Sequence, residues 1–161
     1  MSLSLLLEPD KKWMQAALRE AERAMEQDEV PVGAVVVYGN RIVGRGHNMV
    51  EQLKDPTAHA EMIAITAACE TLGRKQLADC TMYVTLEPCP MCAGAIVWAR
   101  LRRLSFGAFD DKAGAASTLY NILQDGRLNH QVEIVSGLEG DKAADLLRAF
   151  FAKKRKQGKR Y

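Results

Sequence analysis

Two short segments constrain this chain most, because their side chains can form one metal site only if folding brings them together. The first is His59-Ala60-Glu61, and the second is Pro88-Cys89-Pro90-Met91-Cys92. One imidazole and two thiolates are suitable ligands for a tetrahedral Zn²⁺, and a catalytic zinc keeps its fourth position open for water. We therefore expect one Zn²⁺ per chain, bound by His59, Cys89 and Cys92.

Glu61 lies two residues after His59, close enough to reach a metal-bound water without being a ligand. That position suits a residue that transfers protons. Either segment alone is a weak signal, because CxxC also occurs in redox pairs and structural zinc knuckles. A closed structural site would need a fourth ligand, and no ligand-like spacing is repeated by the remaining candidates, Cys69, Cys80, His47 and His130. The catalytic interpretation is favoured.

Composition predicts an ordinary globular protein. The 161 residues are 48% hydrophobic and 26% charged, which suits a single domain spanning residues 1–161. Apolar runs are broken by charges before they reach membrane-spanning length, and the apolar run 3–7 lacks the basic flank of a secretory signal. We expect a cytoplasmic protein without membrane contact, with Cys69 and Cys80 as free thiols.

The charge is distributed unevenly. The net charge is only +2, but residues 152–161 contain six basic side chains and no acidic one, which leaves the remainder of the chain at −4. A basic tail of this kind favours a polyanionic partner. The alternative is a solvated end that only aids solubility. The six residues are Lys153, Lys154, Arg155, Lys156, Lys159 and Arg160.

Hydrophobic patterning predicts an α/β protein: a three-layer α/β/α sandwich with a mixed five-stranded sheet. We expect strands at 32–38, 41–45, 81–86, 103–107 and 132–136, the first two joined by a tight turn at Gly39-Asn40. We expect helices after a cap at Asp10, over 60–72 with a stop at Gly73, over 90–99 and from about 141, and a short helix at 119–123. The unit 81–107 reads as a right-handed parallel crossover, with the cysteines at the carboxyl end of a strand.

Two motifs carry a resemblance to a known family. Residues 55–61, Asp-Pro-Thr-Ala-His-Ala-Glu, and residues 86–95, Leu-Glu-Pro-Cys-Pro-Met-Cys-Ala-Gly-Ala, resemble the cytidine deaminase superfamily and specifically its tRNA adenosine deaminases. The segments 29–35, 46–48 and 112–116 also resemble that branch. The family signature combines HxE with PCxxC.

The resemblance implies His59, Cys89 and Cys92 as zinc ligands and Glu61 as the proton shuttle. It further implies hydrolysis of the wobble adenosine of a tRNA anticodon to inosine, by a homodimer with a cytidine deaminase-like fold. Asn48 matches a family residue that holds the base, although an Asn following a strand is also ordinary turn chemistry. The full set expected to bind substrate is Asn48, Ala60, Leu86, Asp110, Phe151, Lys153, Lys154 and Arg155.

Departures from the family pattern keep other readings open. Phe109 stands where many members have Arg, and Trp98-Ala99-Arg100 is also similar to guanine deaminases. We interpret Trp98 and Phe150 as core residues and Phe151 as a residue that stacks on a base. The second hypothesis is a deaminase of a free base such as guanine or cytosine. The third is a non-catalytic zinc protein that binds RNA or a partner, and the presence of Glu61 weighs against it.

Overall fold

The computed structural model describes residues 3–159, and side chains from residue 9 onward. One mixed sheet of five strands has the order β2-β1-β3-β4-β5. The hairpin β1–β2 and the pair β1–β3 are antiparallel, whereas β3–β4 and β4–β5 are parallel, as the crossover prediction required. The strands are β1 (Gly33–Tyr38), β2 (Arg41–His47), β3 (Cys80–Leu86), β4 (Arg103–Ala108) and β5 (Glu133–Ser136).

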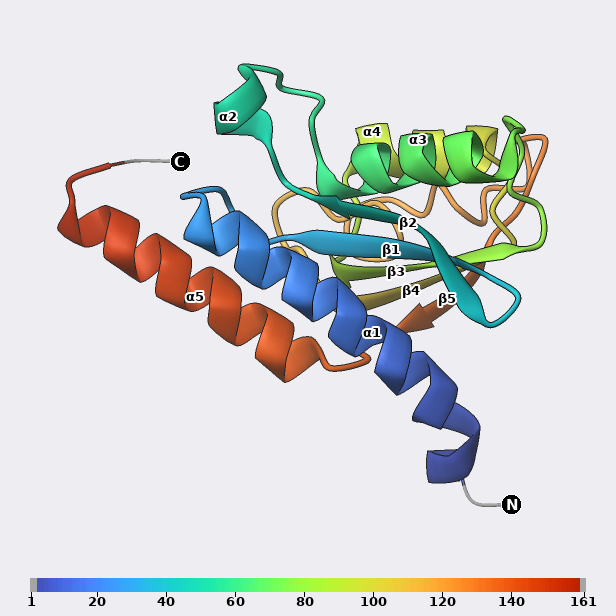
Figure 1. Ribbon diagram of the computed structural model, residues 1–161, viewed down its shortest axis with the longest axis horizontal. Helices are drawn as coiled ribbons and strands as arrows, with labels where there is room; N and C mark the ends of the chain where they lie inside the picture. The colour runs from blue at the N-terminus through green and yellow to red at the C-terminus, as the bar shows by residue number, and fades with distance from the viewer. Residues whose placement is uncertain (1–2, 160–161) are drawn as a thin grey trace.

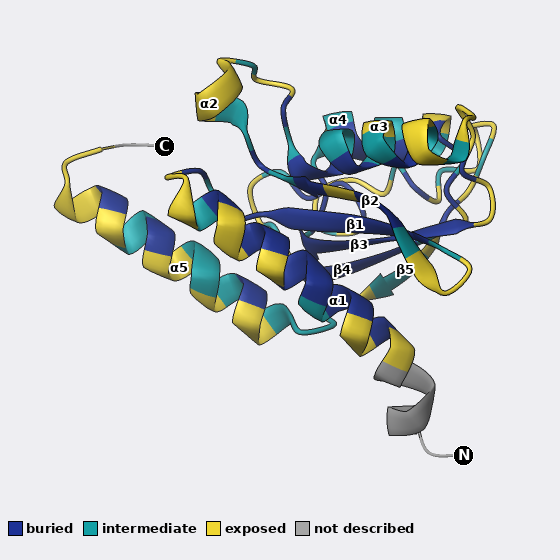
Figure 2. Ribbon diagram, in the orientation of Figure 1, coloured by how far each residue is buried: buried dark blue, intermediate teal, exposed yellow. Residues whose placement is uncertain are grey.

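Helices cover both faces of this sheet, which confirms the three-layer α/β/α prediction. Figure 1 shows α3 and α4 on one face and α1 and α5 side by side on the other. The central strands are buried between these layers (Figure 2), and Val35 and Val36 of β1 are fully buried, as expected for an apolar run covered twice. The helices are α1 (Leu3–Glu26), α2 (Val50–Leu53), α3 (Ala60–Leu72), α4 (Pro90–Trp98) and α5 (Gly140–Lys156).

Close packing of α3 on β2 fixes where α3 begins. A Cβ added at Gly46 would lie 2.2 Å from the carbonyl oxygen of Ala60, and one added at Gly44 would lie 2.4 Å from that of Ala64. Only residues without a side chain allow the helix to approach the strand this closely. The two glycines of β2 therefore set the position of the first turn of α3.

Asp10 is not the cap of the first helix, because α1 begins at Leu3 and continues through it. The Asp10 carboxylate is buried. It accepts a hydrogen bond from the Tyr83 hydroxyl and forms an ion pair with Arg103 at 2.6 Å. Tertiary partners thus take the carboxylate that the sequence pattern assigned to the helix end.

Two further predictions, on residues 119–123 and on Trp98, are corrected. Residues 119–123 form no helix, because the segment is held in an irregular path in which the amide of Val132 donates to the carbonyl of Leu123 at 2.8 Å. Trp98 is 81% exposed and is no core residue. Helix α3 is buried on one face only, through Ala60, Glu61, Ala64 and Ala68. In the part of the chain that is described, no helix is both long and apolar enough to cross a membrane.

Candidate metal centre and base pocket

The three predicted ligands lie at the starts of two helices. His59 is the N-cap of α3 and Cys89 is the N-cap of α4, with Pro90 at the first helical position, where proline costs no hydrogen bond. Cys92 follows within the first turn of α4 and is fully buried. Both helices direct their N-terminal ends at the site, and the positive end of a helix dipole favours thiolate.

Folding brings the three ligand atoms together. Nδ1 of His59 lies 3.7 Å from Sγ of Cys89 and 3.5 Å from Sγ of Cys92, and all three atoms lie within 4.8 Å of one another. Tetrahedral coordination with the usual zinc–nitrogen and zinc–sulfur bond lengths separates nitrogen from sulfur by about 3.6 Å. The cluster could therefore hold a metal ion with little rearrangement, and within the described part of the chain it supplies three ligands and no fourth.

The two sulfur atoms and the imidazole lie within hydrogen-bond distance, and the three groups shift one another's pKa. A hydrogen bond from the Cys92 thiol, supported by His59, lowers the pKa of Cys89 to about 4. The Cys89 hydrogen bond and burial raise the pKa of Cys92. The hydrogen bond to Cys89 also raises the pKa of His59. The lowered pKa of Cys89 favours the thiolate form that metal ligation requires.

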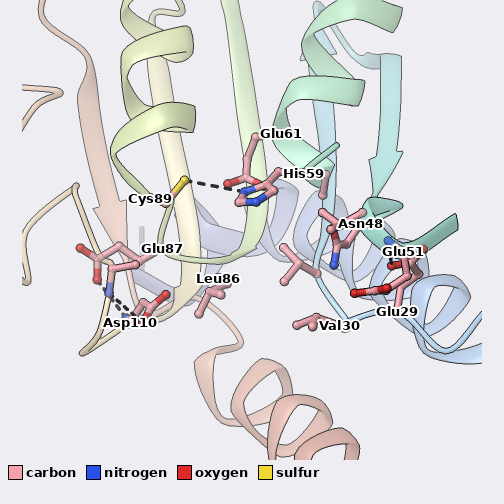
Figure 3. A pocket seen from close by; sticks show the side chains of 14 residues that line it. Glu29, Val30, Asn48, Glu51, His59, Glu61, Leu86, Glu87, Cys89 and Asp110 are labelled. Carbon is pink, nitrogen blue, oxygen red and sulfur yellow. Dashed lines mark hydrogen bonds between the residues drawn. The ribbon is translucent and has the colours of Figure 1, made fainter. Parts of the chain in front are cut away.

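Glu61 lies beside the ligands without belonging to their cluster. Its side chain is buried in the first turn of α3, and burial raises the pKa of the carboxyl group. Figure 3 shows Glu61, His59 and Cys89 together at the wall of the cavity. A carboxyl group whose pKa is moved towards neutrality can both accept and release a proton during turnover.

A cavity of about 290 Å³ opens beside the cluster. Such a volume lies at the small end of ligand pockets, and a single base is a better match than a larger molecule. Oδ1 of Asn48 is buried and has no hydrogen-bond partner among the described residues, so it can accept a hydrogen bond from a ligand. Among the predicted substrate-binding residues, the cavity wall includes Asn48, Ala60, Leu86 and Asp110.

Sequence reasoning missed two buried carboxylates that shape this cavity. Glu29 accepts hydrogen bonds from the backbone amides of Glu51 at 2.9 Å and Gln52 at 2.7 Å. Glu87 accepts the amides of four loop residues, Asp110, Ala116, Ser117 and Thr118. Both line the cavity. Both stand inside the segments that resemble the family, but no local pattern identifies a carboxylate whose partners are distant backbone amides.

The predicted RNA-contacting residues lie outside the cavity lining, on the last turns of α5. Lys153 and Arg155 are exposed, and Phe151 is half-buried with its ring edge-on to the buried Phe150. Lys154 departs from the prediction, because only 1% of its side chain is exposed and its ammonium group pairs with Asp28 at 2.5 Å. Arg160 lies outside the described residues.

The site combines a His-Cys-Cys cluster that could bind a metal, at the starts of two helices, with a buried carboxylate beside an open cavity large enough for a base. Together with the fold, these features define the class of enzyme as a deaminase. The model of the MafB19-like deaminase family matches residues 8–155 of the chain.

Individual relatives narrow the class. The chain is 49% identical to a tRNA-specific adenosine deaminase of Bacillus subtilis over 93% of both chains. A structure from a study of A-to-I editing by tRNA:A34 deaminases at the wobble position is 45% identical, with a TM-score of 0.81 over 84% of this chain and 99% of that one. A guanine deaminase from Nitrosomonas europaea is 26% identical, with a TM-score of 0.76 over 88% and 84%. The chain belongs to the tRNA-specific adenosine deaminase family.

Proposed function

We propose that this protein hydrolyses the exocyclic amino group of the wobble adenosine in a tRNA anticodon, giving inosine and ammonia. The observation that carries the proposal is the His-Cys-Cys cluster with Glu61 at the wall of a base-sized cavity. Identity of 45–49% to tRNA adenosine deaminases over most of the chain supports adenosine in tRNA as the substrate.

The metal in this proposal is one Zn²⁺ per chain, bound by His59, Cys89 and Cys92. Two thiolates and an imidazole form a borderline-soft set that suits zinc, and three protein ligands leave one position open. When bound, zinc supplies a Lewis acid that makes water nucleophilic near neutral pH.

The residues around the cavity then have separate tasks. Glu61 takes a proton from the attacking water and delivers it to the ring nitrogen next to C6. It then takes the proton of the new hydroxyl group on C6 and delivers it to the amino group, which leaves as ammonia. Asn48 accepts a hydrogen bond from the base through the oxygen that is otherwise unpaired. Leu86 and Ala60 supply apolar contact with the base, and Asp110 lies on the opposite rim from Glu29 (Figure 3).

We place the RNA backbone along the last turns of α5. Lys153 and Arg155 are exposed there and can contact phosphates, and Phe151 is positioned to stack on a neighbouring base. A tRNA substrate implies a cytoplasmic enzyme. Residues 1–161 act as a single domain in this proposal, because four of the basic residues belong to the last helix of the same fold: Lys153, Lys154, Arg155 and Lys156.

The protein also forms a homodimer in this proposal. Trp98 is 81% exposed at the end of α4. It lies beside a hollow of about 290 Å³ whose lining is mainly apolar and includes Val97, Ile122 and Leu128. Exposed aromatic surface of this kind is typical of an interface. Sedimentation should show a dimer at micromolar concentration, and Trp98→Lys should shift it to a monomer.

Guanine is the competing substrate, because the chain also shares its fold with a guanine deaminase. Incubation with bulk tRNA, and separately with guanine and cytosine, decides between them. We expect inosine in tRNA and ammonia from tRNA only. Release of ammonia from guanine, with unmodified tRNA, would replace this proposal by the free-base hypothesis; inactivity on all three, with zinc bound, would favour the non-catalytic one.

A further inference from the structure

The buried ammonium group of Lys154 joins the end of α5 to the turn that follows α1. Lys154 lies over the ring of Phe150, 5.4 Å from its centroid, and pairs with Asp28 at 2.5 Å. The hydrogen bond from Lys154 lowers the pKa of Asp28. Removing a lysine from water is costly unless its charge is paired. This ion pair therefore fixes the last turns of α5 against the turn formed by residues 27–29.

The same turn continues into the rim of the base cavity. Asp28 has a positive φ of 62°, and the next side chain, Glu29, lies inward and is 1% exposed. Each carboxylate oxygen of Glu29 accepts one backbone amide, from Glu51 and from Gln52. Both amides belong to α2, and Val50 and Glu51 of α2 line the cavity. In Figure 1 the ends of α1 and α5 and the short helix α2 lie at the same end of the molecule.

We propose that Lys154 is a positioning residue for the deamination reaction: through Asp28 it holds the 27–29 turn, so that Glu29 keeps α2 in place as one rim of the base cavity. This inference rests on the proposed function for its activity readout. It separates Lys154 from its exposed neighbours Lys153 and Arg155, which contact phosphates. In this proposal the ion pair of Lys154 also fixes the distance between the phosphate contacts of α5 and the cavity.

The decisive variant is Lys154→Met, which keeps the buried volume and removes the charge. Hydrogen exchange of the Glu51 and Gln52 amides should become about tenfold faster or more, because their acceptor is no longer held. The value of kcat/KM should fall about tenfold to a hundredfold on both tRNA and a short anticodon hairpin, the range expected for a misplaced rim. The slope of log affinity for tRNA against log salt should stay at the parent value.

Matched variants distinguish this role from a phosphate contact. Lys153→Met should flatten the salt slope by about 0.7 and leave exchange in α2 unchanged. Lys142→Met removes the same charge at the exposed start of α5 and should leave both readouts within about twofold. Asp28→Asn keeps a residue that tolerates positive φ and should also loosen α2. The variant with both changes should be no looser than the worse single variant, because both break one contact.

Parental exchange at Glu51 and Gln52 in Lys154→Met would overturn the inference, as would a flattened salt slope with parental turnover of the hairpin. Additive loosening in the double variant would also contradict it. If the parent protein deaminates no tRNA, the proposed function fails. The exchange measurement still tests, without any activity, whether the ion pair of Lys154 and Asp28 holds α2 in place.

Discussion

Substituting Gly46 by Ala tests the idea that β2 sets the position of α3, which begins next to His59. The added Cβ would lie 2.2 Å from the carbonyl oxygen of Ala60 and 2.8 Å from the amide nitrogen of Ala64, whereas ordinary contact begins at 3.4 Å. The first turn of α3 must therefore move by about 1.2 Å to remove the closest contact. His59 and Glu61 lie at that turn, so both should move with it.

The two consequences can be calculated separately. Overpacking of this kind costs about 1–3 kcal/mol, which in a chain of this size lowers Tm by roughly 2–12 °C. A displacement of about 1 Å at catalytic groups reduces the rate about a hundredfold. Thermal unfolding of the zinc-loaded protein and single-turnover deamination of tRNA measure the two effects.

Gly126→Ala is the control, because a Cβ there meets nothing within 4 Å. It should stay within about 0.5 kcal/mol of the parent stability and keep the parent rate. A Gly46→Ala protein with the parent Tm and the parent rate would refute the packing argument. A lowered Tm with an unchanged rate would show that the helix start does not control the chemistry.

Four further outcomes are expected. Glu61→Ala should keep its zinc and lose at least about 10²-fold to 10⁴-fold in rate. Cys89→Ala should lose both activity and zinc, and metal analysis measures the zinc against one ion per chain of the parent protein. Although burial opposes it, hydrogen bonding by Thr118 and the loop amides lowers the pKa of Glu87. Its stabilisation should therefore be complete above the unfolded pKa and vanish as pH falls through the lower folded value, and Glu87→Gln should remove this acid-induced loss in unfolding titrations. Replacing the four exposed basic residues of the tail by Gln should flatten the salt dependence of tRNA binding by a slope of about 3, and an unchanged slope would exclude the tail from recognition; the four are Lys153, Arg155, Lys156 and Lys159.

The clustering of His59, Cys89 and Cys92 could be predicted from the sequence because its determinants are local. Pro90 favours a helix start directly after Cys89, and Gly73 ends α3 in the left-handed conformation, as its position suggested. The burial of β1 likewise follows from its unbroken valine run. In each of these cases, neighbouring residues along the chain determine the local structure.

The wrong predictions share one cause: the position of each residue depends on groups that are distant in the sequence. Asp10 looks like a helix cap, but its carboxylate binds Arg103 and Tyr83, which lie on strands distant in the sequence. Lys154 looks like one of several solvated charges in the tail, but the 27–29 turn lies within reach of its ammonium group. Trp98 looks like core because α4 is apolar throughout, yet only one face of that helix is buried, through Cys92, Ala93 and Ile96. Sequence patterns identify residue types, but they do not show which distant groups will meet.

The rim of the cavity shows what such distant meetings achieve. Figure 3 places Glu29 beside Glu51 at one side and Glu87 beside Asp110 at the other. A buried carboxylate without partners would destabilise the fold, so each must be matched by donors. The donors here are backbone amides of α2 and of the 110–118 loop. Two segments with little regular structure of their own are thereby held at fixed positions, which gives the cavity the defined geometry that deamination of one base requires.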